Sequence, residues 1–527
     1  MLSGVSILDC TLRDGGYVND WTFGEANVKF ILKKLTEANV DIVECGFFSP
    51  HKKSGKDRTI FTDFDAIVSL LPYMQSSTLA CMVNYGECEL SDIPDNKWGN
   101  LVVRVAFHEE DFENAILFCK GLKQKGYGVF VQPMNTIEYA KEDIVKMLGM
   151  CETFSPEAVY IVDSFGTLKP DSLIELFKLY EKCLGDDVAI GFHSHNNLQM
   201  SFTNSQCLLQ QDSKKRVIVD SSVLGMGRGA GNLCTELITM YLNDNFKSCY
   251  QIIPILEIVD GCIANIYAKR PWGYSMPYYI ASVNHCHPNY ATYLVNKQTM
   301  GVKAINEVLE RIPSKDKKKF NQKEIEELYI SYQNNDVDDS SAIMKIEELT
   351  QGRNIFVLAP GKSISEQSVL VKEYIKLHNS LVISVNFLSD DIPADVLFYS
   401  NSKRANTIDF KALESANSPI IATSNVSLKG ENVLEVNYKS LVDTRFDEAD
   451  NACLMLLRLL KLIGRNCVII AGFDGFSYNN SNYHSEKASN IVSNEVIDVR
   501  NKEISLQLKN LMEDMQIHFL TPSVYVG

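Results

Sequence analysis

Several features that would assign this chain to a common class are absent from its sequence. No apolar run approaches the roughly 20 residues needed to cross a bilayer, and residues 1–4 carry neither a basic segment nor a long apolar core. Basic residues do not dominate, because 51 Lys and Arg stand against 66 Asp and Glu, a net charge of −15. The sequence argues against a membrane protein, a secreted precursor and a nucleic-acid-binding surface, so we expect a cytoplasmic protein.

The sequence also lacks a disulfide pattern, internal repeats and low-complexity tracts. None of its 14 cysteines forms a CxxC pair, and several, such as Cys10, Cys45 and Cys81, lie inside apolar runs. Without a secretion signal such thiols are expected to stay reduced and buried. With 45% hydrophobic and 22% charged residues the composition is globular, and 527 residues fit two or three domains.

Short apolar runs alternate with amphipathic stretches in the first part of the chain. The runs are continuous in Val, Ile, Leu and Phe, as strands buried on both faces are. Eight strands are predicted, at residues 6–10, 42–47, 78–83, 101–107, 128–134, 159–163, 188–193 and 217–223. Helical patterns separate them, for example at 24–38, where Val28 and Ile31 share one face. Eight βα units predict an α/β TIM barrel over residues 1–245, and a doubly wound open sheet is the alternative.

The rest of the chain divides into three predicted segments. Residues 246–310 are aromatic-rich and form a helical extension, the expected surface of a homodimer, and residues 311–350 form a charged linker or helix. Residues 351–527 show a second α/β pattern and predict a Rossmann-like domain. Its strands are predicted at residues 355–358, 382–386, 396–400, 419–423 and 468–471.

One turn of the C-terminal domain could bind phosphate. Gly361, Lys362 and Ser363 lie between a predicted strand and a helix, where free amides can hold an anion. The domain has no GxGxxG, and an ordinary turn is the alternative. Residues 358–363 and 471–476 resemble nucleotide-binding modules attached to bacterial surface-polysaccharide enzymes, which implies a nucleotide at this domain and a role in polysaccharide biosynthesis.

Two motifs place metal-binding residue types at the ends of predicted strands. Arg13 and Asp14 follow the first strand, and His193 and His195 end the seventh. Residues i and i+2 of an extended segment point the same way, so the two imidazoles can aim at one point. In a closed barrel Asp14 joins them, and this set leaves positions for water and substrate, as a catalytic metal requires. Two histidines lining a metal-free polar pocket are the alternative.

A glycine-rich turn follows the eighth strand. It reads Gly-Met-Gly-Arg-Gly-Ala-Gly-Asn over residues 225–232. Backbone amides at Gly229 and Gly231 could hold a carboxylate or phosphate of the substrate, and Asn232 could reach the metal or its waters. Barrel enzymes often bind anions at this place, so the turn is predicted to bind substrate.

Together these motifs resemble the metal-dependent barrel lyases and synthases. Thr11-Leu12-Arg13-Asp14-Gly15, His193-x-His195 and Gly229-Ala230-Gly231-Asn232 with Glu236 are similar to motifs of 4-hydroxy-2-oxovalerate aldolase, hydroxymethylglutaryl-CoA lyase and isopropylmalate synthase. The resemblance covers roughly residues 5–300. It implies a divalent ion, manganese or magnesium, on Asp14, His193 and His195. It also implies that Arg13 stabilises an enolate and that Glu44 orients Arg13 or the substrate.

One position departs from the family pattern. In the oxovalerate aldolases a histidine three residues after the aspartate acts as the base, and this chain has Tyr17 there. A tyrosine has an ordinary pKa of about 10, so Tyr17 would need activation to act as a base. It could instead donate a hydrogen bond, with His108 or Tyr278 as the proton acceptor.

The sequence therefore predicts an aldolase-type lyase that breaks or forms a C–C bond beside a 2-oxo acid, with pyruvate as product or substrate. A Claisen-type synthase that joins an acyl-CoA to a 2-oxo acid is one alternative. A non-catalytic protein that senses a nucleotide is the other. No nucleic acid or membrane partner is expected.

Overall fold

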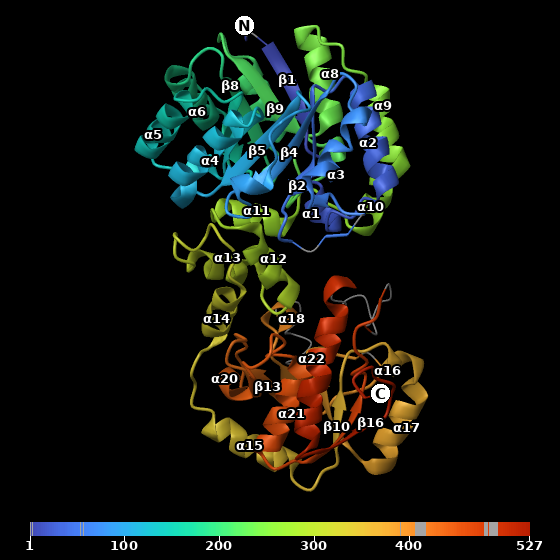
Figure 1. Cartoon of the computed structure of the whole chain (residues 1–527). Coiled ribbons are helices and arrows are strands. Elements are labelled where there is room, and N and C mark those ends of the chain that lie inside the picture. The colour runs from blue at the N-terminus through green and yellow to red at the C-terminus, as the bar shows by residue number, and fades with distance from the viewer. Residues whose placement is uncertain are drawn as a thin grey trace. The chain divides into compact units, whose positions relative to one another are not determined.

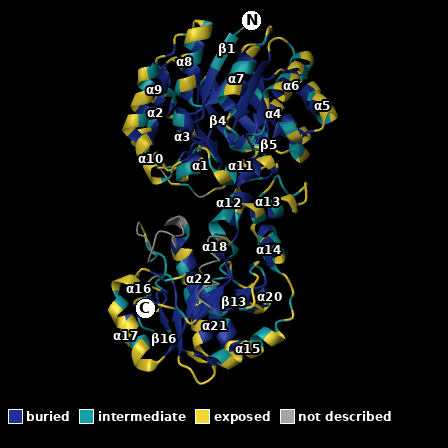
Figure 2. Cartoon of the chain, turned by 180° about the vertical axis from the view of Figure 1, so that it is seen from behind, coloured by how far each residue is buried: buried dark blue, intermediate teal, exposed yellow. Residues whose placement is uncertain are grey.

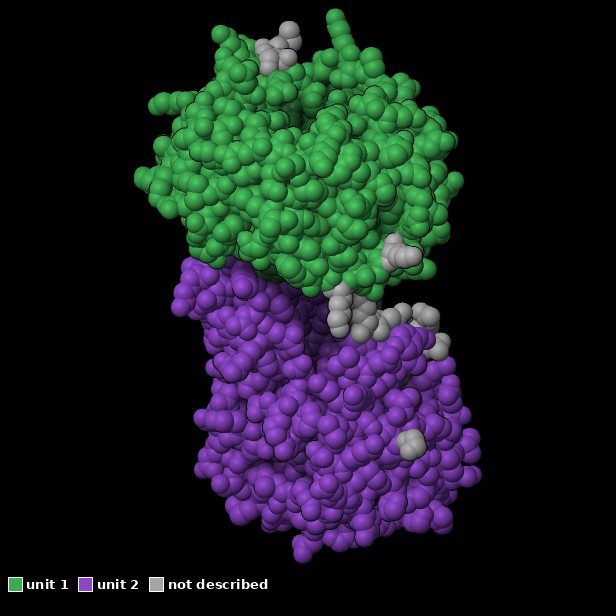
Figure 3. Space-filling view, in the orientation of Figure 1, with its two compact units in different colours: residues 1–288 green, residues 289–527 purple. Residues whose placement is uncertain are grey.

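The computed structural model describes residues 2, 4–52, 54–55, 57–389, 391–405, 418–478, 483 and 494–526, with side chains of the last segment from residue 496. The chain divides into two compact units, residues 1–288 and 289–527 (Figure 3). The division falls inside the segment 246–310 that the sequence assigns to a helical extension. Each unit has an α/β architecture of its own.

The first unit contains a closed barrel of parallel strands (Figure 1). Its strands are β1 (Gly4–Asp9), β2 (Ile42–Phe48), β4 (Thr78–Asn84), β5 (Leu101–Phe107), β6 (Gly128–Pro133), β7 (Ala158–Asp163), β8 (Ala189–Ser194) and β9 (Arg216–Ser221). They pair in chain order, and β1 pairs with both β9 and β2, which closes the ring. A short strand, β3 (Ile60–Phe61), also pairs with β2. The predicted TIM barrel is confirmed, and the open-sheet alternative is wrong.

Amphipathic helices surround the barrel and turn their apolar faces to it (Figure 2). They are α2 (Glu25–Glu37), α3 (Phe64–Val68), α4 (Phe112–Gln124), α5 (Lys141–Glu152), α6 (Pro170–Cys183), α7 (Ser201–Leu209) and α8 (Thr235–Phe246). The predicted face of α2 is buried, including Val28 and Ile31. A one-turn helix, α1 (Gly16–Asn19), follows β1, and α9 (Ile252–Ile258), α10 (Ala264–Lys269) and α11 (Met276–Val283) follow α8.

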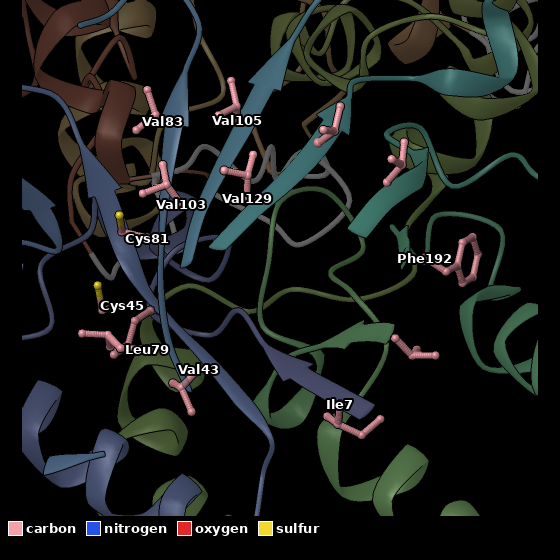
Figure 4. Close-up of a cluster of buried hydrophobic side chains, with 14 of the residues drawn as sticks. Ile7, Val43, Cys45, Leu79, Cys81, Val83, Val103, Val105, Val129 and Phe192 are labelled. Atoms are coloured by element: carbon pink, nitrogen blue, oxygen red, sulfur yellow. The ribbon is translucent and has the colours of Figure 1, made fainter. Parts of the chain in front are cut away.

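The two faces of the barrel strands carry different side chains. Ile7, Val43 and Val103 face the helices and belong to the large core between helices and strands (Figure 4). Neighbouring positions, such as Ile42 and Val102, form a smaller cluster of their own. Two residues farther along the same strands, on the same face, buried charged residues replace the apolar ones: Glu44, Arg104 and, on β9, Asp220. The polar layer therefore lies toward the C-terminal ends of the strands.

The second unit is a doubly wound parallel sheet. Four helices precede it: α12 (Pro288–Lys297), α13 (Val302–Glu310), α14 (Gln322–Gln333) and α15 (Ser340–Thr350). Its strands are β10 (Ile355–Leu358), β11 (Leu381–Val385), β12 (Val396–Tyr399), β13 (Ile420–Thr423), β14 (Val433–Val436), β15 (Cys467–Ala471) and β16 (Gln516–Phe519). Their order is β14-β13-β12-β11-β10-β15-β16. The helices around them are α16 (Ser363–Glu366), α17 (Ser368–His378), α18 (Ser402–Ala405), α20 (Tyr438–Leu441), α21 (Ala452–Leu462) and α22 (Asn494–Met512).

This topology confirms the predicted Rossmann-like sheet, with β14 and β16 as strands that the sequence patterns did not predict. The strand order reverses between β10 and β15, the place where such sheets bind ligands. In the part of the chain that the structure describes, no helix is long and apolar enough to cross a membrane.

Candidate metal centre

Asp14, His193 and His195 meet at the C-terminal ends of β1 and β8. One ligand atom from each residue lies within 4.8 Å of the other two, and all three side chains are buried. The two imidazoles are nearly perpendicular, with ring centroids 5.3 Å apart. The ends of β1 and β8, which lie on either side of β9, thus bring a carboxylate and two imidazoles to one point. The i, i+2 spacing of the two histidines turns both imidazoles the same way.

The protonation states of these residues suit a cation. Burial alone would raise the pKa of Asp14, but the Arg13 guanidinium and both histidines hold that pKa well below its usual range. Burial lowers the pKa of His195 to about 3, so its imidazole is neutral. Its Nδ1 is buried and has no hydrogen-bond partner among the described atoms. An anionic oxygen and a buried, unpartnered imidazole nitrogen fit a divalent metal ion.

The orientation of the His193 imidazole is fixed by a buried carboxylate, Asp220. Its Nδ1 lies 2.9 Å from Oδ2 of Asp220, which is held in turn by the buried Arg104. Burial raises the pKa of Asp220, but Arg104 and His193 together lower it, so this residue is a carboxylate. A carboxylate on Nδ1 leaves Nε2 to face a metal, an arrangement common at metal-binding histidines. Asp220 and Arg104 were not predicted from the sequence.

A second buried chain of ion pairs orients Arg13. Its Nε donates to Glu44 at 2.8 Å, and its Nη1 donates to Asp14 at 2.7 Å. The same Glu44 oxygen lies 3.0 Å from Nη1 of Arg104. Arg104 therefore joins Glu44 to Asp220, and a continuous buried network links the two sides of the centre. The resemblance implies that Glu44 orients Arg13 or the substrate, and in this structure Glu44 accepts a hydrogen bond from Arg13.

The glycine-rich turn packs directly on the centre. Asn232 donates to Asp14 at 2.6 Å and to the Met226 carbonyl at 3.1 Å. A Cβ on Gly227 would lie 2.6 Å from Oδ2 of Asp14. Gly229 and Gly231 have φ of +70° and +85°, and a Cβ on Gly231 would lie 2.0 Å from the Gly225 carbonyl oxygen. Only glycine lets the turn come this close.

The candidates for proton transfer lie farther out. Tyr17 is 42% exposed, and its ring packs against Trp21 and Phe47. His108 follows β5 with an exposed side chain, and Tyr278 lies half-buried in α11, where burial raises its pKa. Among the residues that the structure describes, none of these three side chains has a hydrogen bond to Asp14, His193 or His195.

The turn predicted to bind phosphate is occupied by the protein's own groups. The Ser363 amide donates to Asp474 at 2.8 Å, and the Gly361 amide donates to the Gly472 carbonyl at 2.8 Å. Lys362 pairs with Glu366 at 3.0 Å. The amides of Gly361 and Ser363 are therefore not free, contrary to the prediction, and a carboxylate already lies where the phosphate was expected.

A separate cavity of about 160 Å³ lies in the second unit, at the C-terminal ends of β10, β11 and β15. Asn386, Arg404, Asp450, Asp474 and Arg500 are among its lining residues. This is the switch point of the sheet, where ligands of doubly wound folds bind. Cationic and anionic side chains line it together.

Comparisons with known proteins point to the barrel. Residues 104–255 match the HMGL-like family model. The 4-hydroxy-2-oxovalerate aldolase of Geobacillus thermodenitrificans is 25% identical over 266 residues, 49% of this chain and 76% of the relative. The aldolase of the same name from Geobacillus stearothermophilus is 27% identical over 266 residues, again 49% and 76%.

Among solved structures, the N-terminal domain of a Bacteroides vulgatus protein described as an aldolase is 26% identical, with a TM-score of 0.48 over 55% of this chain and 96% of that chain. The family match and the two 4-hydroxy-2-oxovalerate aldolases confirm the resemblance seen in the sequence. They also confirm the prediction of an enzyme of the carbon–carbon lyase class.

Proposed function

We propose that this chain is a divalent-metal-dependent aldolase that breaks or forms a C–C bond beside a 2-oxo acid, with pyruvate as that acid. The observation that carries the proposal is the convergence of Asp14, His193 and His195 beside a buried, oriented Arg13. The HMGL-like match and the similarity to 4-hydroxy-2-oxovalerate aldolases support the same class.

Each side chain has a role in this proposal. Asp14, His193 and His195 would hold the metal, for which manganese and magnesium are the candidates. When bound, the ion would act as a Lewis acid on the 2-oxo carbonyl. Arg13, fixed by Glu44 and Asp14, stabilises the negative charge of the pyruvate enolate. In cleavage the 4-hydroxyl loses its proton, the C3–C4 bond breaks with its electron pair going to C3, and C3 then takes up a proton.

We assign the proton transfer at the hydroxyl to Tyr17, with His108 and Tyr278 as the other candidates. Tyr17 lies in the one-turn helix α1, which follows Asp14 closely in the chain. Its side chain therefore begins near the proposed metal ligands. Tyr17 is exposed, so in this proposal its phenol is accessible to the departing aldehyde. Asn232, Gly229 and Gly231 complete the proposed substrate-binding turn.

Metal-dependent release of pyruvate tests the proposal. Protein stripped with a chelator is mixed with 4-hydroxy-2-oxopentanoate, with and without Mn²⁺ or Mg²⁺, and pyruvate is followed with lactate dehydrogenase. We expect pyruvate only with metal, and we expect Asp14→Ala to abolish both Mn²⁺ binding and turnover. Asp171→Ala, an exposed carboxylate in α6, is the matched control. Full activity of a metal-free Asp14→Ala protein would contradict the proposal.

The two alternatives predict different results. A Claisen-type synthase would release free thiol from acetyl-CoA in the presence of a 2-oxo acid and metal. A nucleotide sensor would be stabilised against heat by nucleotides and not by metals or 2-oxo acids. The cavity at the switch point of the second unit is the one observation that favours the sensor.

A further inference from the structure

A second arginine, Arg228, lies at the rim of the metal centre and has no role in the chemistry proposed above. It follows Gly227, whose backbone packs against Asp14 and Asn232. Its guanidinium carbon lies 5.6 Å from the centroid of the Tyr17 ring. Its Nη2 donates to the Ser164 carbonyl, in the loop after β7, at 3.3 Å. Arg228 therefore reaches across the mouth from the β9 loop.

Arg228 differs from the other arginines of the site in the number of carboxylates close to its guanidinium. Arg13 and Arg104 each pair with two carboxylates. No carboxylate of the described chain lies within 4.0 Å of the half-buried Arg228 guanidinium. The nearby imidazole of His287 is neutral, because burial and the charge of Arg228 lower its pKa to about 3. A partly desolvated guanidinium without a counter-ion favours an anionic ligand.

The turn that carries Arg228 is held in place on both sides. Asn197 accepts from the Ala230 amide at 2.8 Å and donates to the Phe165 carbonyl at 3.0 Å, which ties the glycine-rich turn to the loop after β7. Trp272 donates to the Leu224 carbonyl at 2.9 Å. The guanidinium is thus positioned before any ligand arrives, which favours specific recognition.

The position of Arg228 indicates which part of a substrate it meets. Arg13 and Asp14 are 5% and 1% exposed, whereas Tyr17, beside Arg228, is 42% exposed. A 2-oxo acid held at the buried centre would therefore extend its far end outward past Tyr17. Another neighbour of the Tyr17 ring, Phe47, is apolar and clusters with Met82 and Ala106. Arg228 supplies a charge on the β9 side of this mouth.

We infer that Arg228 binds an anionic group, a carboxylate or a phosphate, on the part of the substrate that becomes the aldehyde. The inference rests on the proposed aldolase function and narrows its substrate to 4-hydroxy-2-oxo acids with a negatively charged far end. Arg228 determines specificity in this scheme, while Arg13 acts at the enolate.

Two substrate series test the inference. Pyruvate release is measured with Mn²⁺ from 4-hydroxy-2-oxopentanoate, 4-hydroxy-2-oxohexanedioate and 4-hydroxy-2-oxo-5-phosphopentanoate, which carry a methyl, a carboxylate and a phosphate at the far end. Binding is measured by calorimetry with the unreactive pair 2-oxohexanoate and 2-oxohexanedioate. We expect at least one anionic substrate to exceed the neutral one about tenfold or more in kcat/KM, and 2-oxohexanedioate to bind correspondingly tighter. The better of the two anionic substrates distinguishes carboxylate from phosphate.

Arg228→Gln should remove the preference by lowering kcat/KM for the anionic substrate about ten- to a hundredfold, while the neutral substrate changes less than about twofold. Arg228→Lys, which keeps the positive charge, should retain part of the preference for the anionic substrate. Arg216→Gln, at the exposed start of β9, is the matched control and should change neither.

Equal loss with neutral and anionic substrates, or equal binding of the unreactive pair to the wild type, would overturn the inference and leave the aldolase function intact. Absence of pyruvate from every substrate would contradict the aldolase function, and the binding pair would still decide whether Arg228 selects an anion.

Discussion

Asp220 touches no proposed substrate, yet it sets the direction of a metal-binding imidazole. It holds Nδ1 of His193 at 2.9 Å inside a fully buried network. We expect Asp220→Asn to lower Mn²⁺ affinity about ten- to a hundredfold, because the amide no longer fixes the proton on Nδ1. Free Mn²⁺ measured by electron paramagnetic resonance gives the affinity directly. Asp9→Asn alters an equally buried carboxylate bonded to Thr11 and Thr235, and it should leave the affinity unchanged.

Asp9 itself predicts a pH effect on stability. Burial raises its pKa from 3.8 to about 6, against the hydrogen bonds from Thr235 and Thr11. The folded state therefore holds this proton more tightly than the unfolded state, and the contribution of Asp9 to stability falls as pH rises from about 4 to 6.

An asparagine at position 9 does not ionise, so the folded protein does not bear the cost of a buried negative charge there. Asp9→Asn should raise the free energy of unfolding by up to about 3 kcal/mol at pH 7.5 and by little at pH 4. Urea unfolding at both pH values measures this change in the free energy of unfolding. An equal effect of Asp9→Asn at the two pH values would contradict the raised pKa of Asp9.

At the residue scale, the sequence predicts the candidate metal ligands better than the buried residues that orient those ligands. His193 and His195 lie at the end of a strand and Asp14 follows one, where a polar side chain stands out against an apolar run. Arg104 and Asp220 lie within such runs, in Leu-Val-Val-Arg-Val-Ala-Phe and Arg-Val-Ile-Val-Asp-Ser. A lone charge in a doubly buried strand requires a partner of opposite sign. That rule could have paired these two residues, but only after the barrel had brought their strands together.

At the element scale, the barrel was predictable because each of its strands is apolar on both faces over most of its length, which marks a strand between helices and a closed interior. The strands β14 and β16 were not predicted. Both lie at the edges of the second sheet and carry exposed residues, such as Glu435 and Gln516, that interrupt the apolar run. The bonding of the Gly361–Ser363 turn could not be predicted either, because its acceptor, Asp474, lies 111 residues from Ser363.

That acceptor gives a prediction about the second sheet. Asp474 takes both the amide and the hydroxyl of Ser363, joining the loops after β10 and β15. Asp474→Ala leaves both donors of the buried Ser363 without this acceptor, so we expect it to lower the free energy of unfolding by about 1–3 kcal/mol. Asp514→Ala removes an exposed ion pair with Lys461 and should change stability by less than about 0.5 kcal/mol. Denaturant midpoints of the two variants should differ accordingly; equal midpoints would contradict a structural role for Asp474.

At the scale of the whole molecule, each unit has apolar clusters of its own. The large cluster around the barrel extends from Ile7 to Trp272, and the main cluster of the second unit from Ile346 to Tyr525. Such separate cores are typical of domains that fold alone. The sequence analysis predicted a barrel over residues 1–245.

Truncation of the chain distinguishes the two boundaries. Ile255, Ile258, Ile263 and Trp272 lie beyond residue 245, are at most 9% exposed and belong to the barrel cluster. Burial of each contributes about 1.5–3 kcal/mol, together a large part of a typical stability of about 5–15 kcal/mol. We expect a protein of residues 1–288 to melt cooperatively and to bind Mn²⁺ like the full chain, and a protein of residues 1–245 to be unfolded or markedly less stable. Circular dichroism melts and Mn²⁺ titrations of the two proteins decide between a boundary at residue 245 and one at residue 288. Equal stability would place the end of the barrel domain at 245, and failure of 1–288 to fold would show that the barrel needs the second unit.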